Sequence, residues 1–306
     1  MNLLTRSPTL LHPLLRAVLL RLPLPPLQPP LFLLGCGRSG TTLLGQCLGA
    51  HPEVTYLNEP RLLWSSCFPE TDIWSPNPEK RHARLLLGSE TVTDRARRRL
   101  VRRFTLETLF TGRPRLVEKT PANNFRIPFV LALFPEARFL YLERDGLDVA
   151  HSIAKQTNWY GEGHNDKWRQ LTALAERRAD MQEWPARCES PFHKGLLEWR
   201  LSCQMAREHL GTLIPADRVR FLHYECFVAD PCAALCAVFA WLGWPCHSAP
   251  LDFARKNVRP PTSGTLSHPT LDAMATELAG PLLNVHRHDV HACRSKGIAL
   301  FPPPGP

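Results

Sequence analysis

A glycine-rich turn near the start of the chain combines residue types that bind phosphate. Residues 35–42 read GCGRSGTT and follow the apolar run 31–35. Glycine lets the backbone curl until several N–H groups point inward, and a helix that begins at the turn adds its positive end. An arginine charge and three hydroxyl groups complete such an anion nest. The turn therefore predicts a phosphate site, and the residues expected to line it are Gly37, Arg38, Ser39, Gly40, Thr41 and Thr42. The alternative is a glycine-rich turn that holds no ligand.

A second anion site is predicted by Arg144 and Ser152, which are eight residues apart. Arg144 leaves the end of the apolar run 138–143, and Ser152 lies farther along the helix expected next. An arginine and a hydroxyl that straddle a strand-to-helix turn can hold one phosphate between them. The alternative is purely structural: Asp145 caps the helix, while Arg144 and Ser152 face solvent.

The first turn departs from the loop of ATP-hydrolysing enzymes. Gly35 and Gly40 fit the Walker A pattern G-x-x-x-x-G-K-S/T, but Thr41 stands at the lysine position. A kinase or triphosphatase would therefore lack the charge that bridges the β- and γ-phosphates. The sequence predicts phosphate binding without ATP hydrolysis, and a P-loop kinase-like phosphotransferase is the nearest enzymatic alternative.

The elements that must position these residues alternate between strand and helix. Apolar runs followed by helical spacing predict a parallel sheet that is covered by helices on both faces. The predicted strands are 31–35, 116–119, 138–143 and 219–224. The predicted helices are 41–48, 94–110, 124–134, 147–156, 195–210 and 231–242, the last with Asp230 as its N-cap. Residues 65–93 show no clear period and are expected to form loops.

Composition limits the partners without selecting one. The 306 residues carry a net charge of +9, which favours anionic partners. Six of the nine residues from Arg95 to Arg103 are arginine, a run explained equally by a solvated helix face and by a polyanion-binding module. The ten cysteines include no CxxC pair, which favours free thiols in a reducing compartment over a zinc site. One or two disulfides in a secretory lumen are the alternative.

Several of these motifs together resemble the sulfotransferases that use 3′-phosphoadenosine-5′-phosphosulfate (PAPS). GRSGTTLL resembles their 5′-phosphosulfate loop, in the arginine-containing form of the tyrosylprotein and bacterial branches. Residues 144–152 resemble the 3′-phosphate motif R-D-x-x-D-V-x-x-S, and Tyr224-Glu225 resembles a segment whose tyrosine lies near the adenine. Cys226 replaces the aspartate usual there. The resemblance covers about residues 30–245 and implies a P-loop-like, three-layer α/β fold with a central parallel sheet flanked by helices.

The resemblance also implies catalytic roles for three residues. Lys119 lies in a K-S/T/D-P element whose lysine reaches the transferring group, and Arg38 would stabilise the leaving phosphate. Residues 51–61 fit H-P-x-V-x-x-x-x-E-x-R, which makes Glu59 the general base and Arg61 a substrate-binding residue. The alternative for Glu59 is a surface turn, and the rival bases are His51, His151, His164 and His193. The implied cofactor is PAPS, with 3′-phosphoadenosine-5′-phosphate (PAP) as its product and no metal.

The remaining expectations concern organisation and partners. Residues 1–29 are predicted to be a poorly ordered Leu/Pro-rich leader, with weak membrane association possible through residues 1–25. Residues 30–300 are predicted to form the sulfotransferase domain, in which 157–192 is an acceptor-side insertion or lid. The acceptor is left open between a protein tyrosine, a glycan hydroxyl, and a hydroxyl or amine of a small metabolite; no nucleic acid is expected. The expected compartment is the cytoplasm, with the secretory-pathway lumen as the alternative.

Overall fold

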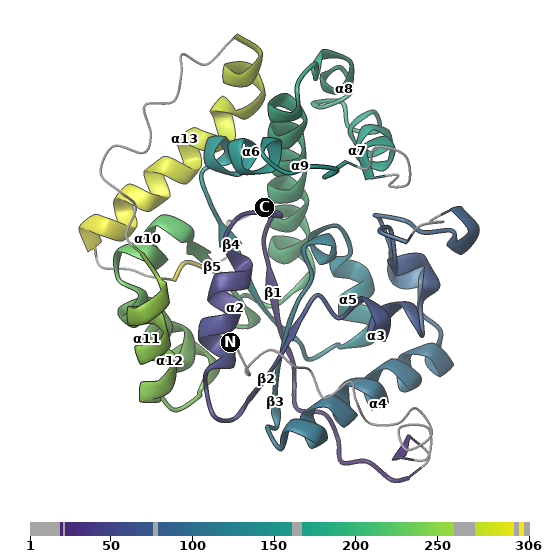
Figure 1. Ribbon diagram of the computed structural model, residues 1–306. Helices are drawn as coiled ribbons and strands as arrows, with labels where there is room; N and C mark the ends of the chain where they lie inside the picture. The colour runs from purple at the N-terminus through teal and green to yellow at the C-terminus, as the bar shows by residue number, and fades with distance from the viewer. Residues whose placement is uncertain are drawn as a thin grey trace.

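Five parallel strands form the centre of the molecule in this computed structural model, which describes residues 19, 20, 22–75, 79–160, 167–259, 273–296 and 300–302 (Figure 1). The strands are β1 (Leu31–Leu34), β2 (Val54–Asn58), β3 (Arg115–Lys119), β4 (Arg138–Glu143) and β5 (Val219–His223). Their order in the sheet is β2-β3-β1-β4-β5, and every neighbouring pair is parallel. The predicted α/β fold with a central parallel sheet is confirmed.

Helices cover both faces of the sheet. The longer ones are α2 (Thr41–Gly49), α4 (Asp94–Thr111), α6 (Gly146–Ala154), α7 (Lys167–Ala175), α9 (Pro191–Leu213), α11 (Pro231–Leu242), α12 (Ser248–Asn257) and α13 (Ala273–Lys296). Short helices are α3 (Arg61–Ser65), α5 (Ile127–Leu133), α8 (Trp184–Arg187) and α10 (Tyr224–Ala229). Figure 1 shows α2, α11 and α12 on one side of the sheet, and α3, α4 and α5 on the other.

The alternation of side chains along β1 explains the two layers. Leu31 and Leu33 enter the core under α2 and α11, whereas Phe32 and Leu34 enter the larger core under α4, α5 and α9. Successive residues of a strand point to opposite faces, so a strand buried on both faces is apolar throughout. This is why the run LFLL shows no polar alternation.

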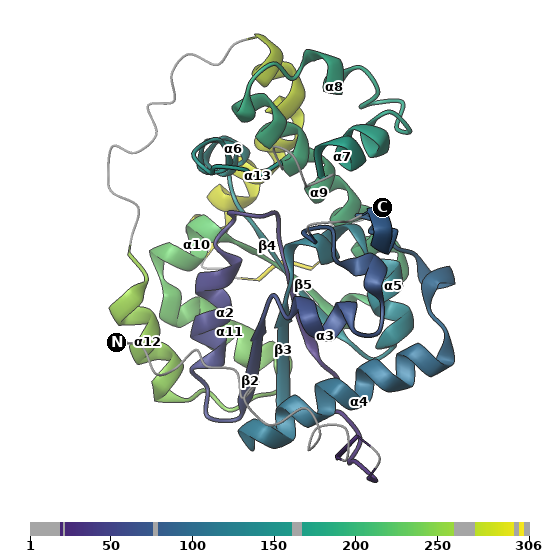
Figure 2. The same ribbon diagram turned by 45° about the vertical axis from the view of Figure 1, so that its right-hand side comes forward.

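The order of the strands determines where a ligand can bind. Because β1 pairs with β3 on one side and β4 on the other, the chain reverses its winding direction at β1. Ligands of open α/β sheets bind at the carboxyl ends of the strands next to such a point. The predicted phosphate turn follows β1 directly. Figure 2 shows α6, α7, α8 and α13 above this same edge of the sheet.

Most of the predicted helices and strands are present, and the structure contains further elements that were not predicted. Asp230 caps α11 as predicted, since its side chain accepts a hydrogen bond from the Ala233 N–H at 2.9 Å. Strand β2 was not among the strands predicted above, and α13 was not predicted. The stretch 157–192 carries α7 and α8, both of which contact α9. Its role as a lid stays a prediction, and residues 161–166 within it lie outside the described residues.

A buried arginine fixes the irregular segment 65–93 against the body of the protein. Arg126 lies at the start of α5 and donates to the backbone carbonyls of Leu85, Thr71 and Arg84. Burial lowers the pKa of Arg126 to about 9, while nearby carboxylates oppose the change. Three carbonyl acceptors satisfy a guanidinium that would otherwise be costly to bury. The described part of the segment, which carries three short 3-10 helices (Pro69–Thr71, Glu79–Arg81 and Ser89–Thr91), is thereby held in place at the rim of the cavity described below.

Two of the ten cysteines are bonded to each other. Cys226 and Cys293 form a disulfide and the other eight cysteines are free, so the expectation of free thiols is wrong at this pair.

The structure describes only part of the predicted leader. Residues 1–18 and 21 lie outside the described residues, whereas the Leu20 carbonyl accepts hydrogen bonds from Arg102 of α4. Among the helices that the structure describes, none has the length and apolar character to span a bilayer.

Candidate active site

A cavity of about 590 Å³ opens at the carboxyl edge of the sheet and gathers most of the residues predicted from sequence. Each of the five strands ends at a predicted site residue or at the phosphate turn. The predicted residues that line the cavity are Gly37, Arg38, Gly40, Thr41, Thr42, Glu59, Lys119, Arg144, Ser152 and Tyr224. Ser39 is buried beneath the turn, and Arg61 lies at the rim outside the lining set.

The phosphate turn adopts a backbone that points its groups into the cavity. Arg38 has φ 72° and Gly40 has φ 93°, both in the left-handed region. A Cβ atom on Gly40 would approach the Tyr224 ring within 2.6 Å, so only glycine fits. The first amides of α2 have no acceptor within the helix and are available to an anion. Residues other than glycine rarely have positive φ, and those that do are concentrated at functional sites.

Two buried polar atoms of the predicted anion sites lack partners. Among the described residues, neither the Ser39 hydroxyl nor Nε of Arg144 has a hydrogen-bond partner. Buried polar groups are normally satisfied, so these two atoms are available as donors to an anion. A nucleotide with two phosphate-bearing ends fits this donor set.

The two predicted anion sites adjoin. Nε of Arg38 donates to the Ser152 hydroxyl at 3.2 Å, and Nη1 of Arg144 lies 3.4 Å from the Arg38 carbonyl oxygen. Arg144 also pairs with Asp148 at 3.1 Å, and its guanidinium lies 4.4 Å from the centre of the Tyr224 ring. The turn after β1 and the turn after β4 therefore lie side by side in the wall of one cavity and bring two arginines together there.

The predicted base and the predicted catalytic lysine touch. Nζ of Lys119 lies 2.5 Å from a Glu59 carboxylate oxygen, and the Glu59 N–H donates to the Lys119 carbonyl at 2.7 Å. The Lys119 side chain is 1% exposed, whereas that of Glu59 is 43% exposed. Glu59 has φ 50°, so the end of β2 turns sharply toward the cavity. This geometry places an exposed carboxylate beside a buried cation at the edge of the cavity.

The residue before Lys119 is a buried carboxyl group. Glu118 accepts hydrogen bonds from Trp64 Nε1 at 2.9 Å, Thr120 Oγ1 at 2.5 Å and Asn123 Nδ2 at 3.1 Å. Burial raises the pKa of Glu118 to about 7, and these three donors reduce the increase. Because successive strand residues face opposite ways, Glu118 anchors the strand from below while Lys119 faces the cavity.

Glu118→Gln is expected to remove one component of the pH dependence of stability. A carboxyl group whose folded-state pKa is raised holds its proton in the folded state while the unfolded chain releases it. Its contribution to stability is complete below about pH 4.5 and is lost as pH rises toward 7. The free energy of unfolding of the parent protein, relative to Glu118→Gln, should fall across this window by on the order of 3 kcal/mol. Urea unfolding at several pH values measures this, and parallel curves for the two proteins would contradict it.

The other sequence candidates occupy less suitable positions. Arg61 pairs with Asp72 at 2.6 Å, so its contact with an acceptor stays a prediction. His51 is buried, and its Nε2 lies 3.0 Å from the Pro245 carbonyl oxygen, away from the cavity lining. The His151 ring lies 4.5 Å from the Phe192 ring, centre to centre, and neither His151 nor His193 is among the lining residues. His164 lies outside the described residues.

A buried ion pair in the cavity wall was missed by the sequence analysis. Nζ of Lys167 lies 2.6 Å from a Glu198 carboxylate oxygen, and Trp159 Nε1 donates to the other oxygen at 2.8 Å. Both side chains of the ion pair are nearly inaccessible, and all three residues line the cavity. The signal available in the sequence was Glu198, which lies between apolar residues on the helix predicted over 195–210. This cluster ties α7 and the Trp159 segment to α9.

One further group could in principle hold a metal ion. Ligand atoms of Glu143, His223 and His286 lie within 4.8 Å of one another, and all three residues are buried. Arg207 already donates to both oxygens of Glu143 at 2.9 Å, and His286 carries a second charge beside it. Burial opposes that charge, but hydrogen bonds to Glu143 and Glu225 prevail and raise the pKa of His286 to about 10. We interpret the group as an ion-pair network; the absence of a metal from the reaction stays a prediction.

The fold and the site together define an α/β protein with a P-loop-like turn at the switch point of its parallel sheet. A model of the Sulfotransferase family matches residues 29–248, and the chain belongs to this family.

Individual relatives agree with this placement. A protein-tyrosine sulfotransferase of Drosophila melanogaster is 34% identical over 129 residues, which cover 41% of this chain and 25% of the relative. Protein-tyrosine sulfotransferase 1 of Homo sapiens is 30% identical over 129 residues, which cover 41% of this chain and 34% of the relative. The aligned parts of this chain thus span about a third or less of the length of these relatives.

Solved structures with low sequence identity share the fold. Sulfotransferase STF1 from Mycobacterium tuberculosis matches with a TM-score of 0.51 and 16% identity, over 83% of this chain and 77% of that one. The sulfotransferase domain from the curacin biosynthetic pathway matches with a TM-score of 0.50 and 16% identity, over 84% of this chain and 98% of that domain.

Proposed function

We propose that the protein transfers a sulfuryl group from PAPS to a hydroxyl or amine of an acceptor. The observation that carries this proposal is a pair of adjoining anion sites at one cavity, the turn after β1 and the Arg144–Ser152 pair. Each contains a buried donor, Ser39 in the first and Arg144 in the second, that lacks a partner among the described residues. A nucleotide phosphorylated at both its 3′ and 5′ positions would occupy both at once. Membership of the sulfotransferase family supports the choice of PAPS as that nucleotide.

The side chains in the cavity suit an in-line displacement. The bond between sulfur and the bridging oxygen breaks as the bond from the acceptor atom to sulfur forms, and the acceptor proton passes to Glu59. Lys119 would neutralise oxygens of the transferring group. Arg38 and the amides of the turn after β1 would stabilise the charge that develops on the leaving 5′-phosphate.

The acceptor side of the cavity is largely aromatic and apolar. Ile73, Trp74, Phe125 and Trp159 are among the residues that line the cavity, and Trp159 lies against Gly37 of the phosphate turn. Such walls favour an acceptor whose hydroxyl or amine is attached to an aromatic or apolar body over an unsubstituted sugar. The names of the tyrosine sulfotransferase relatives support including peptide tyrosines.

A transfer assay with radiolabelled PAPS tests the proposal. We would screen a tyrosine-containing peptide, a simple phenol, a monosaccharide and a primary amine, each with the parent protein and with Glu59→Gln. The expected result is labelled product from the phenol or the peptide, which is lost in the variant. No transfer to any acceptor class, or transfer of phosphate from labelled ATP instead, would refute it.

The two alternative functions receive less support. A kinase-like phosphotransferase would need a cation at Thr41, which the turn does not provide. A polyanion-binding module would use the arginines of α4, but Arg97 and Arg102 already donate to backbone carbonyls of Leu133 and Leu20. The compartment stays a prediction. The disulfide removes the argument from free thiols on which the cytoplasmic expectation relied.

A further inference from the structure

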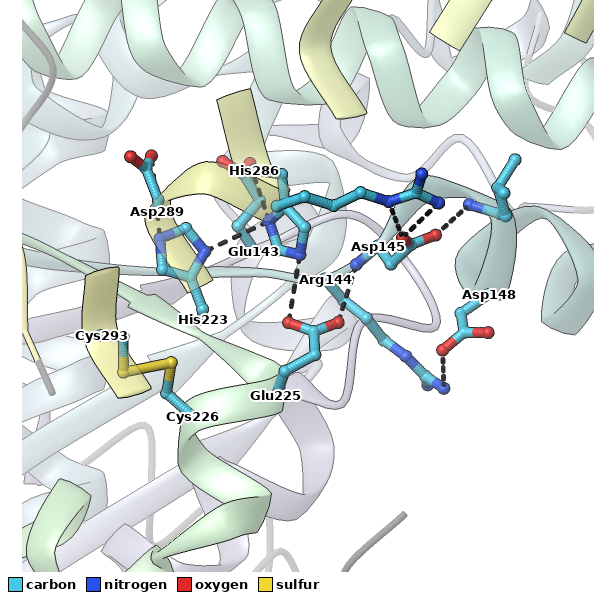
Figure 3. A network of polar contacts seen from close by, with 12 residues as sticks. Glu143, Arg144, Asp145, Asp148, His223, Glu225, Cys226, His286, Asp289 and Cys293 are labelled. Atoms are coloured by element: carbon cyan, nitrogen blue, oxygen red, sulfur yellow. Dashed lines mark hydrogen bonds and ion pairs between the residues drawn. A yellow bond between two sulfur atoms is a disulfide. The ribbon is translucent and has the colours of Figure 1, made fainter. Parts of the chain in front are cut away.

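Helix α13 contacts two segments beside the predicted 3′-phosphate site: the end of β4, just before Arg144, and the start of α10, just after β5. Figure 3 shows His286 between Glu143, at the end of β4, and Glu225, in the first turn of α10. His286 Nδ1 lies 3.3 Å from a Glu143 oxygen, and its Nε2 lies 3.1 Å from a Glu225 oxygen. Both the histidine and Glu143 are buried. A charged imidazole thus bridges the segments that carry Arg144 and Tyr224.

The bridge continues to the start of α6. The other oxygen of Glu225 accepts the Asp145 N–H at 3.0 Å, and Asp145 in turn caps α6 by accepting the Leu147 N–H at 2.9 Å. Arg287, the neighbour of His286, reaches the second Asp145 oxygen at 3.3 Å. Since Arg144 precedes Asp145 and Ser152 lies on α6, these bonds fix the main chain that presents both predicted phosphate ligands.

A covalent link holds α13 on this site. The disulfide joins Cys293, less than two turns after His286 and Arg287, to Cys226, one residue after Glu225 (Figure 3). It spans 67 residues of sequence and anchors the helix to α10 beside the network. The disulfide and the bonds of His286 and Arg287 therefore connect α13 to the segments that carry the predicted 3′-phosphate ligands.

We propose that His286 is a positioning residue for the 3′-phosphate of the nucleotide. It acts through Glu225 and Asp145 on the main chain at Arg144, and Arg287 assists it. The inference rests on the proposed function, since it assigns α13 to a subsite of the same cavity. The larger share falls to His286, because its bonds are buried, whereas Arg287 is 52% exposed and its ion pair is screened by solvent.

The test measures PAP and adenosine 5′-phosphate (AMP) affinities side by side by calorimetry. The two ligands differ only in the 3′-phosphate, so the ratio of their dissociation constants reports on that subsite. His286→Leu is expected to weaken PAP about tenfold, the effect of one charge-assisted hydrogen bond, and to leave AMP unchanged. His288→Leu is the matched control: the same substitution on the same helix, at a side chain that is 83% exposed.

A buried substitution can also lower stability, so two further measurements keep the test decisive. His286→Gln retains one donor and should recover part of the PAP preference. In an Arg144→Ala background, the effect of His286→Leu on PAP should be much smaller, because only the route through Ser152 on α6 remains. A parent protein that binds PAP no better than AMP would refute the proposed function itself. A parent that prefers PAP, with the same preference in both His286 variants, would overturn only the role of His286.

Discussion

Arg144→Ala is expected to reduce the affinity for PAP by about a hundredfold or more while leaving AMP binding nearly unchanged. A guanidinium can form two charge-assisted hydrogen bonds to a phosphate, each worth roughly 1.5–3 kcal/mol. The Arg144 guanidinium lies over Tyr224 with a buried, unpartnered Nε, so it is placed to bind before the ligand arrives. Calorimetric titration of both nucleotides measures the loss.

The control for this variant is Arg95→Ala, which removes an exposed arginine of α4 and should change neither affinity. Thermal unfolding without ligand separates a binding defect from a folding defect, because Arg144 also pairs with Asp148. Retention of parental PAP affinity by a folded Arg144→Ala protein would show that the turn after β4 does not hold the 3′-phosphate.

Glu59→Gln is expected to bind PAP normally and to lower turnover by roughly 10²–10⁴-fold. The amide cannot accept the acceptor proton, and the rest of the site keeps its shape. The ion pair with Lys119 is lost, so that lysine becomes free to contact the transferring oxygens, and nucleotide affinity should not fall. Steady-state rates with labelled PAPS, together with the PAP dissociation constant, give both quantities.

Glu53→Gln offers a matched control for that experiment. Glu53 lies just before β2, pairs with Arg115 at 2.8 Å and is absent from the cavity lining, so its substitution should leave turnover intact. Equal rates for Glu59→Gln and the parent would move the base to another residue.

The local elements could be predicted because their signals lie within short windows. The apolar run of β1, the glycine turn and the Asp230 cap each occupy a few consecutive residues. The stretch that forms β2 was harder to recognise, because VTYLN alternates imperfectly at the edge of the sheet. The motif that contains Glu59 nevertheless identified the residue at its end.

The contacts between distant segments could not be predicted from those windows. Glu198 and Lys167 meet only because α7 folds back on α9, and a glutamate on an amphipathic helix does not identify its partner. Likewise, Glu225 and His286 are 61 residues apart, and nothing in the sequence near the histidine indicates the turn it braces. Pairing of this kind depends on the packing of whole elements, which periodicity does not specify.

A crystal structure of the protein with PAP tests the central claim most directly. We expect a single PAP molecule whose 5′-phosphate accepts hydrogen bonds from the turn after β1, including Ser39 or the amides of Thr41 and Thr42. Its 3′-phosphate should lie between Arg144 and Ser152, with the present contact between Arg38 and Ser152 replaced. A nucleotide bound with its phosphates reversed, or with only one of the two anion sites engaged, would contradict the account.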